Sequence, residues 1–281
     1  MIELLRFDFM QRALIAALLV GLAAPAIGTF MVQRRLALLG DGIGHVALTG
    51  VALGFLTGTA PVLTAVVVSI LGAVAIELVR ARGRTSGDVA LALLFYGGIA
   101  GGVLLISLAP GGSNATLMSY LFGSISSVTV EDVWVIGLLA VAVLGVVTVF
   151  GRELYVLCQD EEVAKASGLP VRFLSLLIAV TAALTVVIAM RVVGLLLVSA
   201  LMVVPVATSQ QLTRGFVSTM LLSMLFGMIS TVGGLTSSFY VEVPPGAIIV
   251  VVALAGFVLA LGLGRFVRRS RSQEFSHEQQ A

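Results

Sequence analysis

The stretch ALIAALLVGLAAPAIGTFMVQ, residues 13–33, contains no Asp, Glu, Lys or Arg. A helix needs about 20 apolar residues to cross the hydrocarbon layer of a membrane, which is roughly 30 Å thick. Further stretches free of these four residue types follow along the chain: 42–76, 89–130, 133–151, 173–190, 192–213, 215–241 and 243–264. This pattern predicts a chain built from membrane-spanning helices.

The composition supports the same conclusion. Of 281 residues, 59% are hydrophobic and 11% are charged, whereas a soluble domain carries about 25% charged residues. The composition excludes a soluble enzyme, a disordered chain and a nucleic-acid-binding protein, which would need clustered Lys and Arg. The single cysteine, Cys158, excludes a disulfide framework and a metal site made of several thiolates.

Two of the apolar stretches are interrupted. Residues 57–61, TGTAP, divide 42–76 into a short helix and a full span, and residues 110–114, PGGSN, end the span within 89–130. We therefore expect an all-α, polytopic membrane protein with eight or nine transmembrane helices in a single transmembrane domain, residues 1–281. Nine crossings place the N-terminus outside the cell, and eight place it inside.

Basic residues occupy alternate connections, at 34–35, 80–84, 152–172, 214 and 265–271. Positively charged loops stay on the cytoplasmic side of a membrane. We therefore expect a multi-pass protein of the cell membrane whose connections 80–87, 151–172 and 210–215 and basic C-terminal tail, 265–281, are cytoplasmic. Tyr120, Trp134 and Tyr240 then lie at the outer interface, where aromatic residues gather.

Charge inside a bilayer is costly, by about 2.5–3.5 kcal/mol on insertion scales, and usually marks function. Glu77 lies near a predicted cytoplasmic helix end, three residues before Arg80. At this spacing Glu77 can form an ion pair with Arg80 or reach water, so a structural role is expected.

The segment GDGIGH, residues 40–45, contains the second candidate. Asp41 and His45 are four residues apart and share one face of a helix. Carboxylate and imidazole groups are good ligands for a divalent first-row metal ion. Two ligands are too few, but a twofold dimer would supply two of each, which suits Zn²⁺, or Mn²⁺ with added water. The alternative is that Asp41 caps the helix and His45 hydrogen-bonds to a neighbour.

The segment DEEVAKASGLP, residues 160–170, predicts a short helix in the longest polar connection. Asp160 is a favourable N-cap, acidic residues follow in the first turn, and Gly168 and Pro170 end the helix. This helix is either an ordinary surface segment or a rigid contact for a cytoplasmic partner.

Motifs for ATP binding and hydrolysis are missing from the sequence. No GxxxxGK[ST] phosphate loop occurs, and Lys165 is the only lysine. HExxH and GxSxG are also absent, so an intramembrane hydrolase has no support. We expect a protein that is not itself an enzyme.

Segments spread in order over nearly the whole chain resemble the permease subunits of zinc/manganese ABC importers. They are MQRAL (10–14), QRRLALLGDGIGH (33–45), GVALG (50–54), MSYLFGS (118–124), the 160–168 helix, VGLLLVSALMVVP (193–205) and VPPG (243–246).

The resemblance implies a fold similar to that of the larger vitamin B12 and iron-siderophore permeases. It also implies a homodimer that works with two cytoplasmic ABC ATPase subunits and an extracytoplasmic metal-binding protein. Asp41 and His45 would bind the passing metal ion, and no cofactor would be bound permanently. The coupling helix that contacts the ATPases would comprise Asp160, Glu161, Glu162, Ala164, Lys165 and Gly168.

The MSYLFGS and VGLLLVS segments look closer to zinc permeases, so Zn²⁺ is the expected substrate and Mn²⁺ or Fe²⁺ the alternative. Carboxylate and imidazole serve all of these ions. A second class is an ion-coupled secondary metal transporter, which would need more ionisable residues in mid-span. A scaffold membrane protein and a permease for iron chelates or a cobalamin-like ligand are the remaining alternatives.

Overall fold

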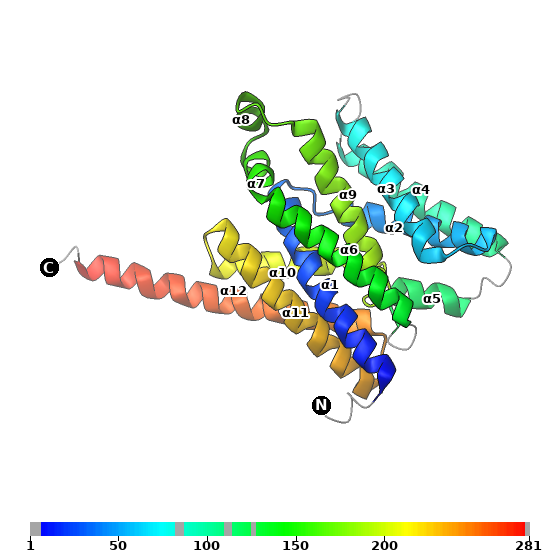
Figure 1. Ribbon diagram of the computed structural model, residues 1–281. Coiled ribbons are helices and arrows are strands. Elements are labelled where there is room, and N and C mark those ends of the chain that lie inside the picture. Colours follow the sequence, from blue (N-terminus) through cyan, green and yellow to red (C-terminus); the bar gives the residue numbers. More distant parts are fainter. Residues whose placement is uncertain (1–6, 82–86, 110–113, 125–127, 279–281) are drawn as a thin grey trace.

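The computed structural model describes residues 7–81, 87–109, 114–124 and 128–278. Within these ranges the chain forms twelve helices and no strand, which confirms the all-α prediction (Figure 1). In chain order the helices are α1 (Asp8–Gln33), α2 (Leu39–Thr57), α3 (Pro61–Ala81), α4 (Gly87–Leu108), α5 (Asn114–Phe122), α6 (Val130–Val149), α7 (Gly151–Gln159), α8 (Glu161–Ala166), α9 (Val171–Met190), α10 (Val198–Leu212), α11 (Phe216–Val241) and α12 (Pro245–Glu278).

Two parts of the predicted basic connections are not described. Arg82 and Arg84, in the 80–87 connection, lie outside the described residues. In the tail, 265–281, α12 continues as a helix to Glu278, but the side chains lie outside the described part of the chain. The remaining basic connections are described with their side chains.

The bundle has two ends, which differ in their residues. The α8 end carries Arg34, Arg80, Glu161 and Arg172, which line one cavity. The α5 end carries Phe9, Phe122, Ser238 and Pro245, which line another. The basic connections that are described therefore share one end, as their alternation predicts; that this end faces the cytoplasm stays a prediction.

Among the described helices, eight are long and apolar enough to cross a membrane, and α10, with 15 residues, is shorter. At about 1.5 Å per residue α10 extends roughly 22 Å. The residues before it contact α5, where Leu195 N donates to Tyr120 O at 2.9 Å. Gly215, just after it, lines a cavity with Arg152 of α7. With α10, the described helices thus make nine passages between the two ends, and α1 begins at the end opposite α8 (Figure 1).

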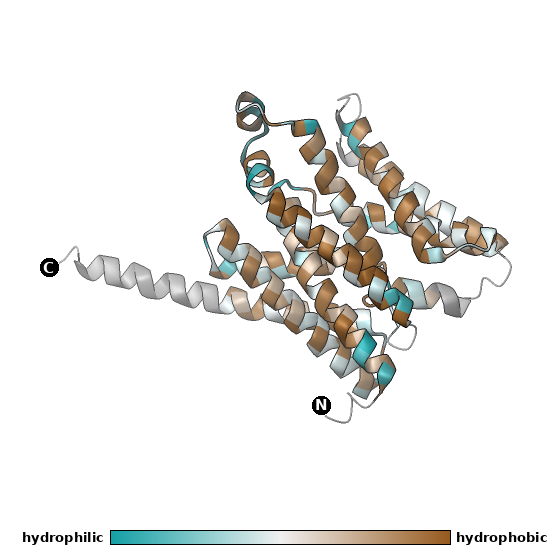
Figure 2. Cartoon of the chain, viewed as in Figure 1, coloured by the Kyte–Doolittle hydropathy of each residue, from teal (hydrophilic) through white to brown (hydrophobic). Residues whose placement is uncertain are grey.

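The helices differ in how much of their surface the bundle covers. In α1 and α9, 72% of the residues in the most apolar stretch of the helix are buried in the bundle, whereas in α4 the share is 22%. Large apolar side chains are exposed on the outer helices, including Leu93, which is 68% exposed, and Leu138, which is 72% exposed. Hydrophilic residues gather in the connections (Figure 2). This is the arrangement expected when lipid surrounds the bundle.

Helix α4 packs directly against the backbone of α2 at Gly98. A Cβ atom on Gly98 would lie 2.6 Å from the carbonyl carbon of His45 and 2.7 Å from Val46 N. Thr49 Oγ1 donates a hydrogen bond of 2.8 Å to Gly98 O. Small residues allow such close approach in membranes, where lipid offers no hydrophobic drive for helix association. Gly98 therefore sets the distance between α4 and the part of α2 that carries His45.

At the α5 end an ion pair joins the end of α9 to the start of α6. Arg191 Nη2 lies 2.7 Å from Asp132 Oδ2, and Arg191 Nε donates to Asp132 Oδ1 at 3.2 Å. The guanidinium carbon also lies 5.2 Å from the centre of the Tyr120 ring. Asp132 forms a capping box with Thr129. The ion pair therefore holds α5, α6 and α9 together.

We predict that Asp132→Asn destabilises the protein. The side chains of Asp132 and Arg191 are 9% and 17% exposed, and removing one partner of a buried ion pair costs about 3–5 kcal/mol. The measurement is thermal unfolding of the detergent-solubilised protein. The control is Glu131→Gln, because Glu131 is an exposed neighbour in the same first turn. Equal midpoints for the two variants would contradict a stabilising role of the ion pair.

We predict that Gly98→Ala destabilises the protein, whereas Gly97→Ala does not. The new methyl group at Gly98 has no room, and overpacking costs about 1–3 kcal/mol. At Gly97 the methyl group meets nothing within 4 Å. Thermal unfolding compares the two variants. The predicted packing is wrong if alanine at Gly98 is tolerated as well as alanine at Gly97.

Candidate functional site

Helix α2 carries both predicted metal ligands. It begins at Leu39, so Asp41 lies within its first turn, and the residue at the N-cap position, Leu38, makes no side-chain cap. Asp41 Oδ1 instead accepts a hydrogen bond from Ser199 Oγ of α10. The capping alternative for Asp41 is therefore wrong, because the carboxylate points across to another helix.

The first turns of α2 and α10 meet at this carboxylate. A Cβ atom on Gly40 would lie 3.3 Å from Ser199 Cβ, and Ser199 is 9% exposed. Helix N-termini carry partial positive charge, which stabilises a nearby carboxylate. Asp41 therefore lies between two helix N-termini, with one carboxylate oxygen bound to a hydroxyl group.

His45 lies one turn further along α2 and is 7% exposed. Its ring meets Phe95 of α4 edge to face, with the ring centres 4.4 Å apart. The Nδ1 atom is buried and has no hydrogen-bond partner among the described residues. Buried polar atoms nearly always have a partner, so this nitrogen is available to bind a metal ion in the tautomer that leaves it unprotonated.

A single copy of the chain does not complete a metal site. In the part of the chain that the structure describes, no group of three or more His, Cys, Asp or Glu side chains lies close enough to hold an ion. Asp41 and His45 supply one oxygen and one nitrogen ligand, and Ser199 brings a second oxygen close to the first. These residues offer fewer ligand atoms than a complete coordination shell requires.

The predicted short helix in the polar connection is confirmed as α8. Asp160 Oδ1 accepts hydrogen bonds from Glu162 N at 2.8 Å and Val163 N at 3.2 Å, so it is the N-cap. Gly168 adopts a left-handed conformation with φ of 76° just after the helix. The side chain of Ala164 is fully buried. Capping at one end and Ala164 on the inner face fix α8 in place.

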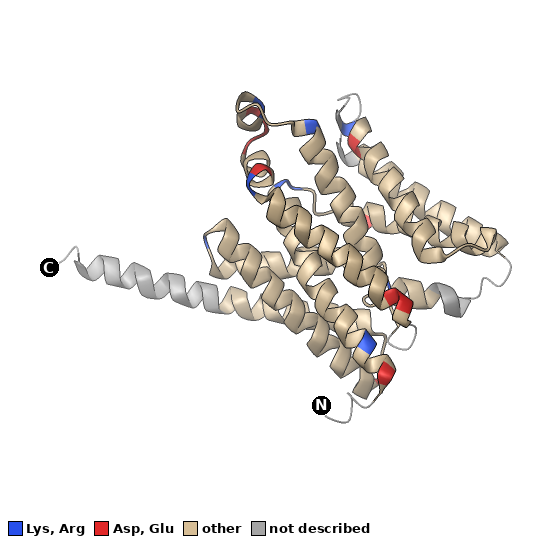
Figure 3. Ribbon diagram, viewed as in Figure 1, with Lys and Arg blue, Asp and Glu red and all other residues tan. Residues whose placement is uncertain are grey.

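The charged residues of α8 pair along the helix and beyond it. Lys165 Nζ lies 2.9 Å from Glu162 Oε1 and 3.2 Å from Glu161 Oε1, and hydrogen bonds to Glu162 and then Glu161 raise the pKa of Lys165. Glu161 Oε2 also lies 3.2 Å from Arg34 Nη2. Charged residues stand out at α8 and at the helix ends (Figure 3). Glu161 thus links α8 to the segment between α1 and α2.

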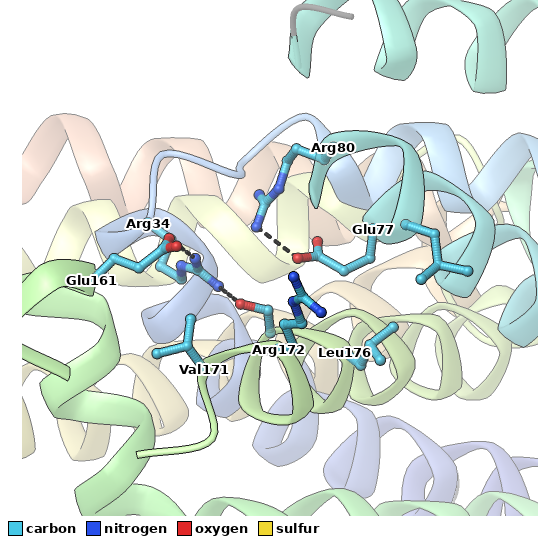
Figure 4. Close-up of a pocket in the computed structure, with 9 residues that line it drawn as sticks. Arg34, Glu77, Arg80, Glu161, Val171, Arg172 and Leu176 are labelled. Atoms are coloured by element: carbon cyan, nitrogen blue, oxygen red, sulfur yellow. Dashed lines mark hydrogen bonds and ion pairs between the residues drawn. The ribbon is translucent and has the colours of Figure 1, made fainter. Parts of the chain in front are cut away.

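Glu77 forms the ion pair with Arg80 that the sequence spacing allows. Arg80 Nη2 lies 3.1 Å from Glu77 Oε1 (Figure 4). Glu77 is 8% exposed, so the arginine supplies the partner that a buried carboxylate requires. The interaction accounts for the charge without a role in metal binding.

Sequence reasoning missed three polar residues that make long-range contacts. Ser199 and Arg34 lie in segments that carry the family resemblance, Arg34 also marks the orientation, and no sequence pattern points to Asp132. One signal was available: Arg191 is the only charged residue in a turn between two apolar stretches. A lone charge there needs a partner, but the sequence does not say which residue supplies it.

Comparison with known proteins identifies the family to which this chain is similar. The model of the ABC 3 transport family matches residues 6–264. The manganese transport system membrane protein MntC of Halalkalibacterium halodurans is 34% identical, over 98% of this chain and 96% of that protein. The manganese import system permease protein ScaB of Streptococcus parasanguinis is 31% identical, over 97% of this chain and 96% of that protein.

Solved structures show the same relationship. The structure titled PsaBC from Streptococcus pneumoniae in complex with Fab superposes with a TM-score of 0.83 and 34% identity, over 92% of each chain. An inward-facing metal-chelate type ABC transporter superposes with a TM-score of 0.72 at 16% identity, over 90% of this chain and 85% of that one. The second match shows the fold alone, and it confirms the predicted likeness to ABC permeases of that type. The family match over residues 6–264 and the relatives at 31–34% identity show that this chain belongs to the ABC 3 transport family.

Proposed function

We propose that this protein is the permease subunit of an ATP-driven importer that moves a divalent transition-metal ion into the cytoplasm. The observation that carries the proposal is the placement of Asp41 and His45 on one face of α2, with Ser199 bonded to Asp41 and His45 Nδ1 without a partner. Family membership and the names of the relatives, which are metal transport proteins, support it.

The coordination shell is completed, in this proposal, by a second copy of the chain. A twofold axis presents the same surface twice, so two copies supply two carboxylates, two imidazoles and two hydroxyl groups from Asp41, His45 and Ser199. The metal ion is the transported substrate and is held only in passing. The axis between the copies then forms the path of the ion.

Manganese is the first candidate ion and zinc the second. Carboxylate and other oxygen ligands suit Mn²⁺. The sequence predicts only Asp41 and His45 as ligands, and the hydroxyl group of Ser199 adds a further oxygen beside them. The relatives quoted above are named as manganese transporters, which does not support the zinc expectation from the MSYLFGS segment. Six ligands from two copies also exceed the four that tetrahedral Zn²⁺ takes.

The energy for import comes, in this proposal, from two ATPase subunits that contact α8. The helix is short, capped by Asp160 and rich in charge, and Glu162 on it has a side chain that is 82% exposed. A metal-binding protein delivers the ion at the α5 end. The permease then opens alternately toward each side of the membrane.

We predict that Asp41→Ala and His45→Ala abolish uptake of ⁵⁴Mn²⁺ into proteoliposomes that contain the assembled complex, because each variant removes a ligand from both copies. Ser199→Ala keeps Asp41 and His45 but removes the hydroxyl oxygen from the site together with its hydrogen bond to Asp41. We expect uptake to fall by about 10–100-fold, the usual loss when a partner of a metal ligand is removed. Ser209→Ala, on the same helix α10, controls for loss of a buried hydroxyl group, because Ser209 Oγ donates to Pro205 O within its own helix. Wild-type uptake by Asp41→Ala at normal protein levels refutes the site.

We predict that Mn²⁺ is transported in preference to Zn²⁺ when both are offered to the same vesicles. Asp41→His replaces an oxygen ligand by nitrogen, and imidazole suits Zn²⁺, so this variant shifts the ratio toward zinc. Uptake of the two ions is measured in competition, with the wild-type complex as reference. Faster zinc uptake by the wild type contradicts the choice of manganese and restores the zinc hypothesis.

A further inference from the structure

A cavity of about 490 Å³ lies at the α8 end, where α3, α8, α9 and the segment between α1 and α2 meet (Figure 4). Its charged lining residues are Arg34, Glu77, Arg80, Glu161 and Arg172. Glu77 and Arg80 pair with each other on α3. Arg34 differs from them because its partners belong to two other helices.

Arg34 uses two guanidinium nitrogens to join α8 and α9. Nη2 lies 3.2 Å from Glu161 Oε2, and Nη1 donates a hydrogen bond of 2.8 Å to Ser175 Oγ. The side chain of Arg34 is 8% exposed. Arginine has a planar fork of donors that can serve two acceptors at once, which lysine cannot reproduce. One buried side chain therefore connects three elements.

The electrostatic surroundings make Arg34 depend on its partners. Burial lowers the pKa of Arg34, and the charge of Arg80 lowers it further, whereas Glu77 and Glu161 act in the opposite direction. A buried cation without a carboxylate is strongly disfavoured. Glu161 is the carboxylate in direct contact, so a change in the position of α8 changes the energy of Arg34.

The segment after Arg34 is held tightly to both flanking helices. Leu36 N donates to Met31 O at 2.8 Å, and Leu39 N donates to Leu36 O at 2.9 Å. Arg35 has a φ of 58° in the left-handed region, which L-residues with a side chain adopt only when the surrounding structure requires it. Five residues, 34–38, separate α1 from α2, and Asp41 follows in the first turn. A shift at Arg34 therefore reaches α2 through a turn that is held by hydrogen bonds.

We propose that Arg34 is a positioning residue that transmits movement of α8 to the first turn of α2, and so to Asp41. The inference rests on the proposed function, because it takes α8 as the ATPase contact and α2 as the metal-binding helix. When α8 moves, Glu161 displaces the guanidinium of Arg34. The hydrogen-bonded turn then moves the N-terminus of α2 relative to Ser199 on α10.

The test uses the full complex in proteoliposomes and measures ⁵⁴Mn²⁺ uptake, ATP hydrolysis and Mn²⁺ binding. For Arg34→Gln we expect normal ATP hydrolysis and normal Mn²⁺ binding, but about tenfold less uptake per ATP, a coupling loss within the usual range of about 5–150-fold. A purely structural role would instead lower all three readouts together. That result, or an unchanged uptake per ATP, overturns the proposal.

Glu161→Gln removes the same contact from its more exposed partner. The Glu161 side chain is 47% exposed, so this variant disturbs folding less than a change at the buried Arg34. We expect the same loss of uptake per ATP. The comparison is Glu162→Gln on the same helix. Glu162 pairs with Lys165, has a side chain that is 82% exposed and lies on the surface proposed for the ATPases, so this variant should lower uptake and ATP hydrolysis together and leave uptake per ATP unchanged. Equal effects of the two glutamate variants overturn the assignment, because they would show that charge on α8 matters and the contact with Arg34 does not.

Reversal of both charges is the most specific test of the contact between Arg34 and Glu161. Arg34→Glu and Glu161→Arg should each uncouple uptake from ATP hydrolysis, and the double variant should restore coupling because the two charges pair again. Arg34→Glu combined with Glu162→Arg should not restore it. Failure of the first combination to rescue contradicts the proposal.

Asp41→Ala in the same vesicles separates this inference from the proposed function. If Asp41→Ala imports Mn²⁺ normally, the metal site is wrong. If Asp41→Ala is inactive while Arg34→Gln and Glu161→Gln couple normally, the metal site stands and the role of Arg34 alone is refuted.

Discussion

Close contact between helix backbones is the constraint on which this structure depends. Lipid tails are as apolar as the side chains, so no hydrophobic effect drives helices together within the membrane. Membrane helices therefore associate through close packing and a few polar links. A Cβ atom on Gly28 of α1 would lie 2.0 Å from Met202 O of α10, and one on Gly234 of α11 would lie 2.5 Å from Ile249 Cα of α12. Gly98 brings α4 equally close to α2. The contact at Gly98 lies against the helix that carries Asp41 and His45, so the position of that helix follows from its packing against α4.

Polar links then fix how the packed helices are related. Asp41 bonds to Ser199 between α2 and α10, Asp132 pairs with Arg191 between α6 and the end of α9, and Glu161 pairs with Arg34 between α8 and the turn before α2. None of these links lies within a single helix. Because unpaired charge is costly in lipid, each link favours one arrangement of the helices over others. Such links are suited to a protein whose work requires helices to move between defined positions.

The link between Asp41 and Ser199 also bears on the choice of ion. A carboxylate and an imidazole alone serve zinc and manganese equally well. The hydroxyl group beside Asp41 makes the set richer in oxygen, which favours the harder ion. In the proposed site, the choice between the two ions therefore rests on a residue that is remote in sequence and adjacent in space.

The local features of this protein follow from the sequence alone. Apolar length predicts the spans, the i,i+4 spacing places Asp41 and His45 on one face of α2, and the cap and stop residues of 160–168 predict α8. The ion pair of Glu77 with Arg80 spans three residues and is equally local. Contacts between distant residues were decided only by the tertiary structure: Asp41 meets Ser199 across 158 residues, and Arg34 meets Glu161 across 127. The tertiary structure also decided that α10 makes the ninth passage. It likewise showed that Asp41 bonds to Ser199 and does not cap α2. Helical periodicity determines which side chains share a face, whereas packing of helices determines which faces meet.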